Sequence, residues 1–201
     1  MLVSEIVTDI IDTLRRPDLQ SFVEVRARQQ IKLLHSFDNF PRDKVEQTIT
    51  IQNPGVLVRT ALPPFWRKWD SIMPITYEGN RMPLPTDDVD WVGFREADPR
   101  KVMGYRDNAD TDFYYVAGDA LNIKMSVAAP KLLVSYYVYP DLRSPNAVTW
   151  VTETFPELST YRILMVCYRM LGNFEQAAAV EQLYQEALAF FISDTSTAGA
   201  N

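Results

Sequence analysis

The sequence has only one cysteine and one histidine, and this scarcity limits the chemistry open to the chain. A single thiol cannot form a disulfide within one chain, and a single imidazole leaves too few ligands for the usual zinc sites. Cys167 lies in an apolar helical run, and His35 follows another. We therefore expect a buried structural thiol and an ordinary imidazole at a helix end.

Long hydrophobic runs are also missing. The run from Ala187 to Ile192 is among the longest, far short of the roughly 20 apolar residues that cross a bilayer. At the amino terminus, Glu5 soon follows Met1, and there is no basic segment of the kind that opens a secretory signal. We expect a soluble protein that stays in the compartment where it is made and has no membrane partner.

Catalytic motifs are absent as well. The sequence has no glycine-rich phosphate loop, and no glycine-framed nucleophile lies near His35. Asp87, Asp88 and Asp90 offer oxygen ligands for Ca²⁺ or Mg²⁺, but they lack the glycine and terminal glutamate of an EF-hand loop, so a solvated turn is favoured. We predict no enzyme activity, no metal and no cofactor.

The charge is acidic and unevenly distributed. The formal net charge is −6, and residues 141–201 contain 3 basic and 7 acidic residues. This balance argues against a strong nucleic-acid binder, because such domains carry clustered cations. If copies surrounded a DNA passage, the acidic carboxy-terminal helices would repel the phosphates. A hydrated acidic surface that aids solubility explains the same charges.

The first 35 residues show two amphipathic helical patterns separated by Pro17, with Asp18 as the expected N-cap of the second. The polar side of the second helix is rich in Arg and Lys, including Arg26, Arg28 and Lys32. This basic face suits either a partner or solvent, with acidic neighbours such as Glu24. The first apolar stripe comprises Val3, Ile6, Val7, Ile10, Ile11 and Leu14, and the second Val23, Ala27, Ile31 and Leu34.

Short β-strands are expected in the middle of the chain. Polar and apolar residues alternate over 48–51, as they do in a half-buried strand. Residues 72–77 are expected to form a second strand, in which Pro74 indicates an edge or a bulge. The clearest pattern is a hairpin, 113–116 and 120–125, joined by Gly118 and Asp119. Residues 132–139 are apolar on both faces, which predicts a central strand.

The last third is helical again. A stripe after Pro156 ends at Gly172, and a second helix follows Asn173, so the two form an antiparallel hairpin. The end of the chain has no large apolar residue, and we expect an extended polar arm that becomes ordered on another chain. The arm comprises Asp194, Thr195, Ser196, Thr197, Ala198, Gly199, Ala200 and Asn201.

These patterns predict an α+β fold in which helices from both ends of the chain form a bundle and a small antiparallel β-domain is inserted between them. The expected parts are the amino-terminal helices (1–47), the β-domain with long loops (48–140), the carboxy-terminal helical hairpin (141–193) and the arm (194–201).

Several segments, taken in order, resemble the head-to-tail adaptor (connector) proteins of tailed bacteriophages. The resemblance covers nearly the whole chain and includes two amino-terminal helices. The other segments that carry it are Phe40-Pro41-Arg42-Asp43, Phe65-Trp66-Arg67-Lys68-Trp69-Asp70, the hairpin with Tyr114-Tyr115-Val116 and Gly118, the strand Val134 to Pro140, and Phe155-Pro156-Glu157 before Leu171-Gly172-Asn173.

The resemblance implies a structural virion protein of the neck, assembled in the bacterial cytoplasm, whose copies form a twelvefold ring on the portal. DNA would pass through this ring without specific binding. The arm, residues 194–201, would insert into the portal, and the β-domain would meet neighbouring subunits, the tail or the next neck protein. Candidate residues for that second interface are Trp66, Arg67, Lys68, Arg100, Lys101 and Arg106.

Two other interpretations compete with this one. The segment Gly172 to Ala177 resembles the helical hairpin of tetratricopeptide repeats, which bind peptides, but a solenoid needs about three repeats and one is visible. Phe65, Trp66 and Trp69 suit stacking on nucleic-acid bases, but the acidic chain favours packing in a core or at a subunit interface.

Overall fold

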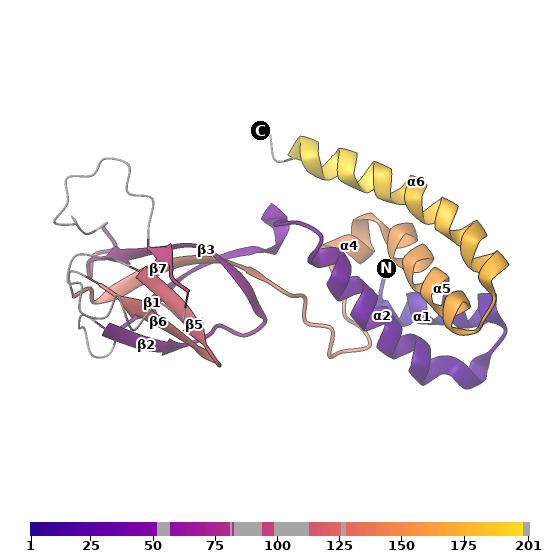
Figure 1. Ribbon diagram of the computed structural model, residues 1–201, viewed down its shortest axis with the longest axis horizontal. Coiled ribbons are helices and arrows are strands. Elements are labelled where there is room, and N and C mark those ends of the chain that lie inside the picture. Colours follow the sequence, from indigo (N-terminus) through magenta and orange to yellow (C-terminus); the bar gives the residue numbers. More distant parts are fainter. Residues whose placement is uncertain (52–56, 81, 83–93, 99–112, 126–127, 199–201) are drawn as a thin grey trace. The chain divides into compact units, whose positions relative to one another are not determined.

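The computed structural model describes residues 1–51, 57–80, 82, 94–98, 113–125 and 128–198. The chain divides into two compact units, a helical unit of Met1–Asp43 with Tyr139–Asn201, and a β unit of Lys44–Val138 (Figure 1). The helices come from both ends of the sequence and a small antiparallel sheet region comes from its middle, which confirms the predicted α+β class. The β unit begins at Lys44 rather than at residue 48, because the first strand is longer than its clearest alternation suggested.

The helical unit contains five α-helices and two short 3₁₀ turns among its described residues. Their bounds are α1 Val3–Leu14, η1 Pro17–Leu19, α2 Gln20–His35, η2 Pro41–Asp43, α4 Trp150–Thr154, α5 Pro156–Met170 and α6 Phe174–Ala198. Asp18 belongs to the η1 turn, and α2 starts after Leu19, so the predicted N-cap was wrong. A proline at the first position of η1 favours this separate turn, since proline fits the start of a helix.

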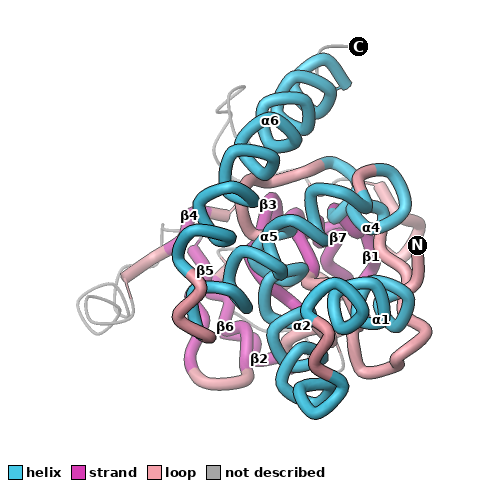
Figure 2. Tube along the Cα trace, turned by 90° about the vertical axis from the view of Figure 1, so that its right-hand side faces the viewer, coloured by secondary structure: helices cyan, strands magenta, loops and turns pink. Residues whose placement is uncertain are grey.

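Helix α5 occupies the centre of this unit and packs against both α2 and α6 (Figure 2). Its Arg162 joins the two neighbours, donating from Nε to Gln30 Oε1 of α2 at 2.9 Å and from Nη1 to the Tyr184 hydroxyl of α6. The α5–α6 hairpin turns at Gly172, whose φ of 78° is the left-handed conformation that glycine adopts without strain.

Two buried clusters hold the helices together. One lies among α1, α2 and α5 and includes Ile6, Ile10, Ile31 and Ile163, all fully buried. The other is aromatic and lies among α2, α4, α5 and α6. In it Phe191 stacks on Trp150 with 5.9 Å between ring centroids and meets Phe40 and Phe155 edge to face.

The β unit contains two sheets that share one core. The first has the order β1-β7-β3 and the second β2-β6-β5-β4, and every pair is antiparallel except β4–β5. The strands are β1 Lys44–Thr50, β2 Leu57–Ala61, β3 Trp66–Ile75, β4 Arg95–Glu96, β5 Phe113–Ala117, β6 Ala120–Lys124 and β7 Lys131–Val138.

Strand β7 is central in its sheet, as its apolar faces predicted, and β3 with Pro74 is an edge strand. The β5–β6 hairpin has its two-residue loop at Gly118 and Asp119, with a φ of 63° at the glycine. A positive φ at the first loop position matches the right-handed twist of the flanking strands.

Candidate interaction surfaces

The segment Trp66–Asp70 forms the first half of β3. Phe65, the residue before it, has a φ of 58°, a conformation that an aromatic residue rarely adopts. The register against β7 shifts between Trp66 and Lys68 and again between Trp69 and Ser71. Two bulges in one edge strand twist it away from simple strand pairing with another chain, so its side chains, rather than its backbone, are suited to contact a partner.

The two tryptophans of this segment pack inward. Trp69 is buried in the core of the β unit, with its ring 5.4 Å from that of Tyr136 and 5.8 Å from the partly buried Trp66. Neither indole nitrogen has a hydrogen-bond partner among the residues that the structure describes. Their position supports the core-packing interpretation over base stacking, because a ring that stacks on a nucleic acid must be exposed.

The cations of the same segment differ in their surroundings. Arg67 lies over the Tyr137 ring, 5.3 Å from its centroid, and Lys68 is exposed. Nearby, Lys44 Nζ lies 2.9 Å from Asp70 Oδ2, and this hydrogen bond lowers the pKa of the Asp70 carboxyl. Of the six residues predicted for a subunit or tail interface, Trp66, Arg67 and Lys68 therefore lie together, while Arg100, Lys101 and Arg106 lie outside the described residues.

Strand β2 is an edge strand of the second sheet among the described residues, and a groove runs along its whole length. The groove is lined by Leu57–Ala61 together with Thr50 and Ile51 at the end of β1. Backbone groups on an edge strand lack a ladder partner, so such a groove is suited to an added strand. The sequence indicated this strand only weakly, since it is short and preceded by a Pro-Gly turn.

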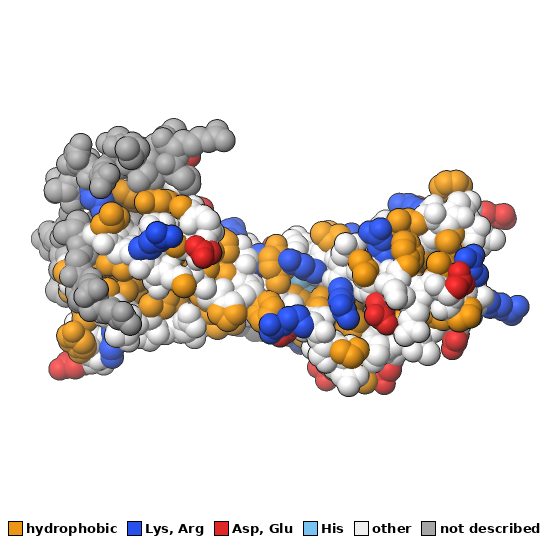
Figure 3. Space-filling view, turned by 90° about the horizontal axis from the view of Figure 1, so that it is seen from below, with side chains coloured by type: hydrophobic (Ala, Val, Ile, Leu, Met, Phe, Trp, Pro, Cys, Tyr) orange, Lys and Arg blue, Asp and Glu red, His pale blue; other side chains and the backbone are white. Residues whose placement is uncertain are grey.

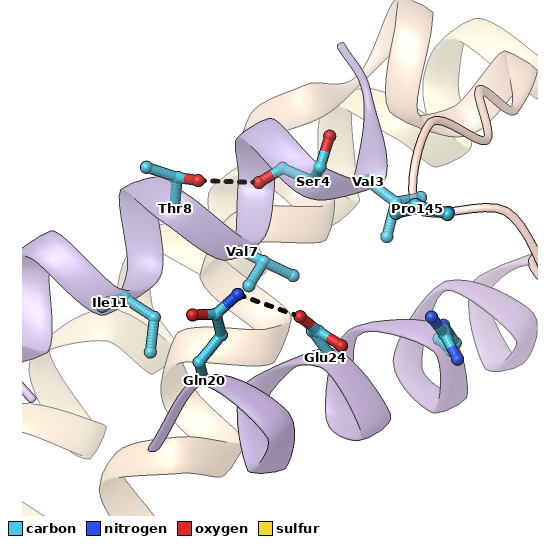
Figure 4. Close-up of a pocket in the computed structure, with 9 residues that line it drawn as sticks. Val3, Ser4, Val7, Thr8, Ile11, Gln20, Glu24 and Pro145 are labelled. Atoms are coloured by element: carbon cyan, nitrogen blue, oxygen red, sulfur yellow. Dashed lines mark hydrogen bonds between the residues drawn. The ribbon is translucent and has the colours of Figure 1, made fainter. Parts of the chain in front are cut away.

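A second groove lies between α1 and α2 in the helical unit (Figure 4). It is lined by apolar residues of α1, by Gln20, Glu24 and Arg28 of α2, and by Pro145. Two hydrogen bonds close within its walls, from the Thr8 hydroxyl to the Ser4 carbonyl and from Gln20 Nε2 to Glu24 Oε1. These two bonds pair four of the polar residues on its rim with one another, which is typical of ordinary helix packing.

The predicted extended arm is wrong for its first five residues. Helix α6 continues to Ala198, and the Thr195 hydroxyl donates to the Phe191 carbonyl at 2.8 Å. The composition of 194–198 suggested that this segment cannot fold alone, but it extends a helix already formed, and propagation is far less costly than nucleation. Residues 199–201 lie outside the described residues.

His35 and Cys167 are both buried in the helical unit. His35 is buried beside Asp43, 2.8 Å from its Oδ1, and Trp150 Nε1 donates to the same carboxylate oxygen at 2.7 Å. Cys167 is buried in the α1–α2–α5 cluster, and this burial raises the pKa of its thiol to about 11. A reactive cysteine needs a lowered thiol pKa, so that the thiolate forms near neutral pH.

Neither a metal-binding group nor a membrane-spanning helix occurs in the part of the chain that the structure describes. There, no group of three His, Cys, Asp or Glu side chains is placed to hold a metal ion. None of the described helices is long and apolar enough to span a bilayer. The aspartates Asp87, Asp88 and Asp90 lie outside the described residues.

Sequence reasoning missed the apolar residues on the outer faces of α2 and α6. Val25 and Leu33 on α2 are each 50% exposed, and Leu183 and Phe190 on α6 are 44% and 67% exposed. The signal was present as a second apolar stripe in each helix, spaced 25/33 and 183/190. The second stripe was overlooked because the stronger apolar stripe of each helix, which packs in the core, already explained the helical pattern.

Comparison with known proteins assigns this architecture to a family. The sequence matches the family model described as SU10 adaptor protein over residues 1–200. The chain therefore belongs to the SU10 adaptor protein family. It is a structural adaptor protein of a phage, its family is not a class of enzymes, and it interacts with other phage head or tail proteins in the virion. Among proteins with curated descriptions, none matches this sequence.

Proposed function

We propose that this chain forms a homo-oligomeric ring in the virion neck, joining the portal at the capsid vertex to the tail and continuing the DNA channel. The observation that carries the proposal is the family match over residues 1–200, which takes in both units. The same match includes α5 and α6, so it also favours an adaptor over a tetratricopeptide-like peptide binder. In this proposal the ring has twelve copies, in agreement with a twelvefold portal, and it assembles in the host cytoplasm.

The carboxy-terminal end of α6 is the proposed portal contact. The segment 194–201 is polar, and its described part is the last turn and a half of a long helix. A polar segment buries little apolar area, so one copy binds weakly. Many copies held in one ring bind strongly, because each bound arm raises the effective concentration of the next. Assembly on the portal is then cooperative.

The β unit is the proposed contact with the tail or the next neck protein. It offers the exposed Lys68 beside Arg67 on β3 and the groove along β2. Neither surface is strongly basic, and the formal net charge of the chain is −6, so we propose that DNA passes through without specific binding.

Deletion of residues 194–201 tests the portal contact. Because Phe191, which is fully buried in the aromatic cluster, is kept, the truncated chain should remain folded by circular dichroism. We expect it not to sediment with rings of the portal protein encoded by the same phage. Replacing Ser193 by Ala in the full-length chain is the matched control and should leave sedimentation unchanged. Portal binding by the truncated chain at the full-length level would overturn the arm assignment.

A further inference from the structure

The outer face of α2 is apolar at its centre and basic along one side. Val25, Gln29 and Leu33 follow one another at spacings of four residues, opposite the buried stripe that includes Ala27 and Ile31. Val25 and Leu33 are each half exposed. A stripe of this kind on a surface helix is suited to receive a second helix.

The charge of α2 is strongly biased. Its sequence contains Arg26, Arg28 and Lys32 but only one carboxylate, Glu24, which accepts a hydrogen bond from Gln20. Lys32 Nζ lies 4.0 Å from the centroid of the Tyr139 ring, and within the described part of the chain none of the three cations forms an ion pair. Figure 3 shows Lys and Arg side chains on one face of the helical unit, with hydrophobic, Asp and Glu side chains among them.

The outer face of α6 has the opposite charge. The helix contains four carboxylates and no Lys or Arg over its 25 residues. Glu181 pairs with Arg169 of α5 at 2.8 Å, and Glu186 is exposed. Leu183 and Phe190, spaced by seven residues with Glu186 between them, form an exposed apolar stripe here too.

These two faces point away from each other across the unit. Helix α5 lies between α2 and α6, and Arg162 binds the inner side of both helices through Gln30 and Tyr184 (Figures 1 and 2). The outer side of each helix is therefore exposed, although the Phe190 ring still meets the Phe155 ring edge to face at 6.1 Å. A closed ring needs two different complementary surfaces on opposite sides of one subunit, because each copy contacts one neighbour with each surface.

We infer that the outer face of α2 packs against the outer face of α6 of the next copy, and that this contact closes the ring. The inference rests on the proposed function, since it names the partner of these faces as a second copy of this chain. The apolar stripes supply the buried area of the contact. Lys32 and its neighbours, set against Glu186 and its neighbours, fix the orientation and disfavour pairing of like faces.

Charge exchange tests the inference. One variant makes α2 acidic with Gln29→Glu and Lys32→Glu, and a second places two lysines on the outer face of α6 with Gln182→Lys and Glu186→Lys; all four positions are exposed. Each variant is incubated with portal rings, and the amount that sediments with them is measured. We expect each variant alone to lose about tenfold or more of the bound protein. The chain carrying all four substitutions should recover most of it, because the attraction is restored with its sign reversed.

Cross-linking tests the geometry independently. Leu33→Cys and Phe190→Cys variants are treated with a bifunctional maleimide on portal rings, and the buried Cys167 serves as an internal unreactive thiol. A head-to-tail contact predicts covalent dimers in the mixture of the two variants and none in either variant alone. Dimers within a single variant would show a symmetric contact and overturn the inference.

The outcomes separate this inference from the proposed function. If the unmodified chain does not bind portal rings, the proposed function fails first. If it binds and both charge variants assemble equally well, the ring stands and the α2–α6 contact is wrong. If the variant with Gln182→Lys and Glu186→Lys assembles normally but its ring retains DNA, α6 lines the channel instead. That result also overturns the α2–α6 contact.

Discussion

His35 Nδ1 lies 2.8 Å from Asp43 Oδ1, and both side chains are buried. Asp43 immediately precedes the first residue of β1, and the same oxygen accepts a hydrogen bond from the Trp150 indole at 2.7 Å. One carboxylate thus ties the end of α2 and the start of α4 to the residue at which the helical unit passes into the β unit.

Replacing Asp43 by Ala should therefore destabilise the helical unit severely. The change leaves a buried imidazole and a partly buried indole without their shared acceptor, and breaking a buried pair typically costs about 3–5 kcal/mol. Urea unfolding followed by tryptophan fluorescence measures the loss. Asp9→Asn, at an exposed position on α1, is the control and should change the unfolding free energy by under about 0.5 kcal/mol. Equal effects of the two substitutions would show that the buried network does not stabilise the fold.

Phe190 and Phe191 are neighbours in sequence with opposite environments. Phe191 is fully buried among Phe40, Trp150 and Phe155, whereas Phe190 is 67% exposed. Phe191→Ala should lower the unfolding free energy by about 3–5 kcal/mol, since it opens a cavity in an aromatic cluster. Phe190→Ala should lower it by under about 1 kcal/mol and instead reduce ring assembly. A larger loss of stability from Phe190→Ala would contradict the orientation of α6.

Cys167 should be protected from thiol reagents in the folded protein. Burial raises the pKa of its thiol to about 11, so little thiolate forms at pH 8 and the reagent has no access. Iodoacetamide at pH 8, followed by mass spectrometry, should leave the native chain unmodified and alkylate it fully in urea. Rapid modification of the native chain would show that the α1–α2–α5 cluster opens readily.

Tyr114 should make the β unit sensitive to alkaline pH. Burial, assisted by the charge of Glu96, raises the pKa of its phenol to about 12, above its ordinary value of 10.0. The folded state keeps the proton more tightly than the unfolded state, so this stabilisation is complete below pH 10 and is lost as the pH rises from 10 towards 12.

Thermal unfolding at pH 8 and at pH 11 checks the effect of Tyr114. Tyr114→Phe removes the ionising group and keeps the ring. The melting temperature of this variant should therefore fall less between pH 8 and pH 11 than that of the unmodified chain. Tyr77→Phe is the control, because Tyr77 is 71% exposed. An equal loss in all three proteins would exclude Tyr114 as a source of the pH dependence.

Local patterns predicted much of this fold because the same residues determine both the turn and the strands. Gly118 and Asp119 between two alternating segments indicated the β5–β6 hairpin, and Gly172 indicated the α5–α6 turn. The position of β7 followed from its two apolar faces. In each case the local preference and the tertiary structure agree.

The errors arose where neighbouring structure overrides composition. Residues 194–198 have the composition of a disordered tail, but they continue an existing helix. Trp66–Asp70 was separated from the strand that follows it, because bulges at Arg67 and Asp70 interrupt the alternation that identifies a strand. The exposed apolar residues of α2 and α6 were missed because each helix pattern was assigned a single apolar side.

Electron microscopy of the full-length chain mixed with portal rings of the same phage tests the central claim most directly. The account predicts one additional ring of density on the portal, with the symmetry of the portal and an open central channel. The account would be contradicted if the portals showed no added density and the chains stayed separate, at protein concentrations well above those of a virion assembly reaction.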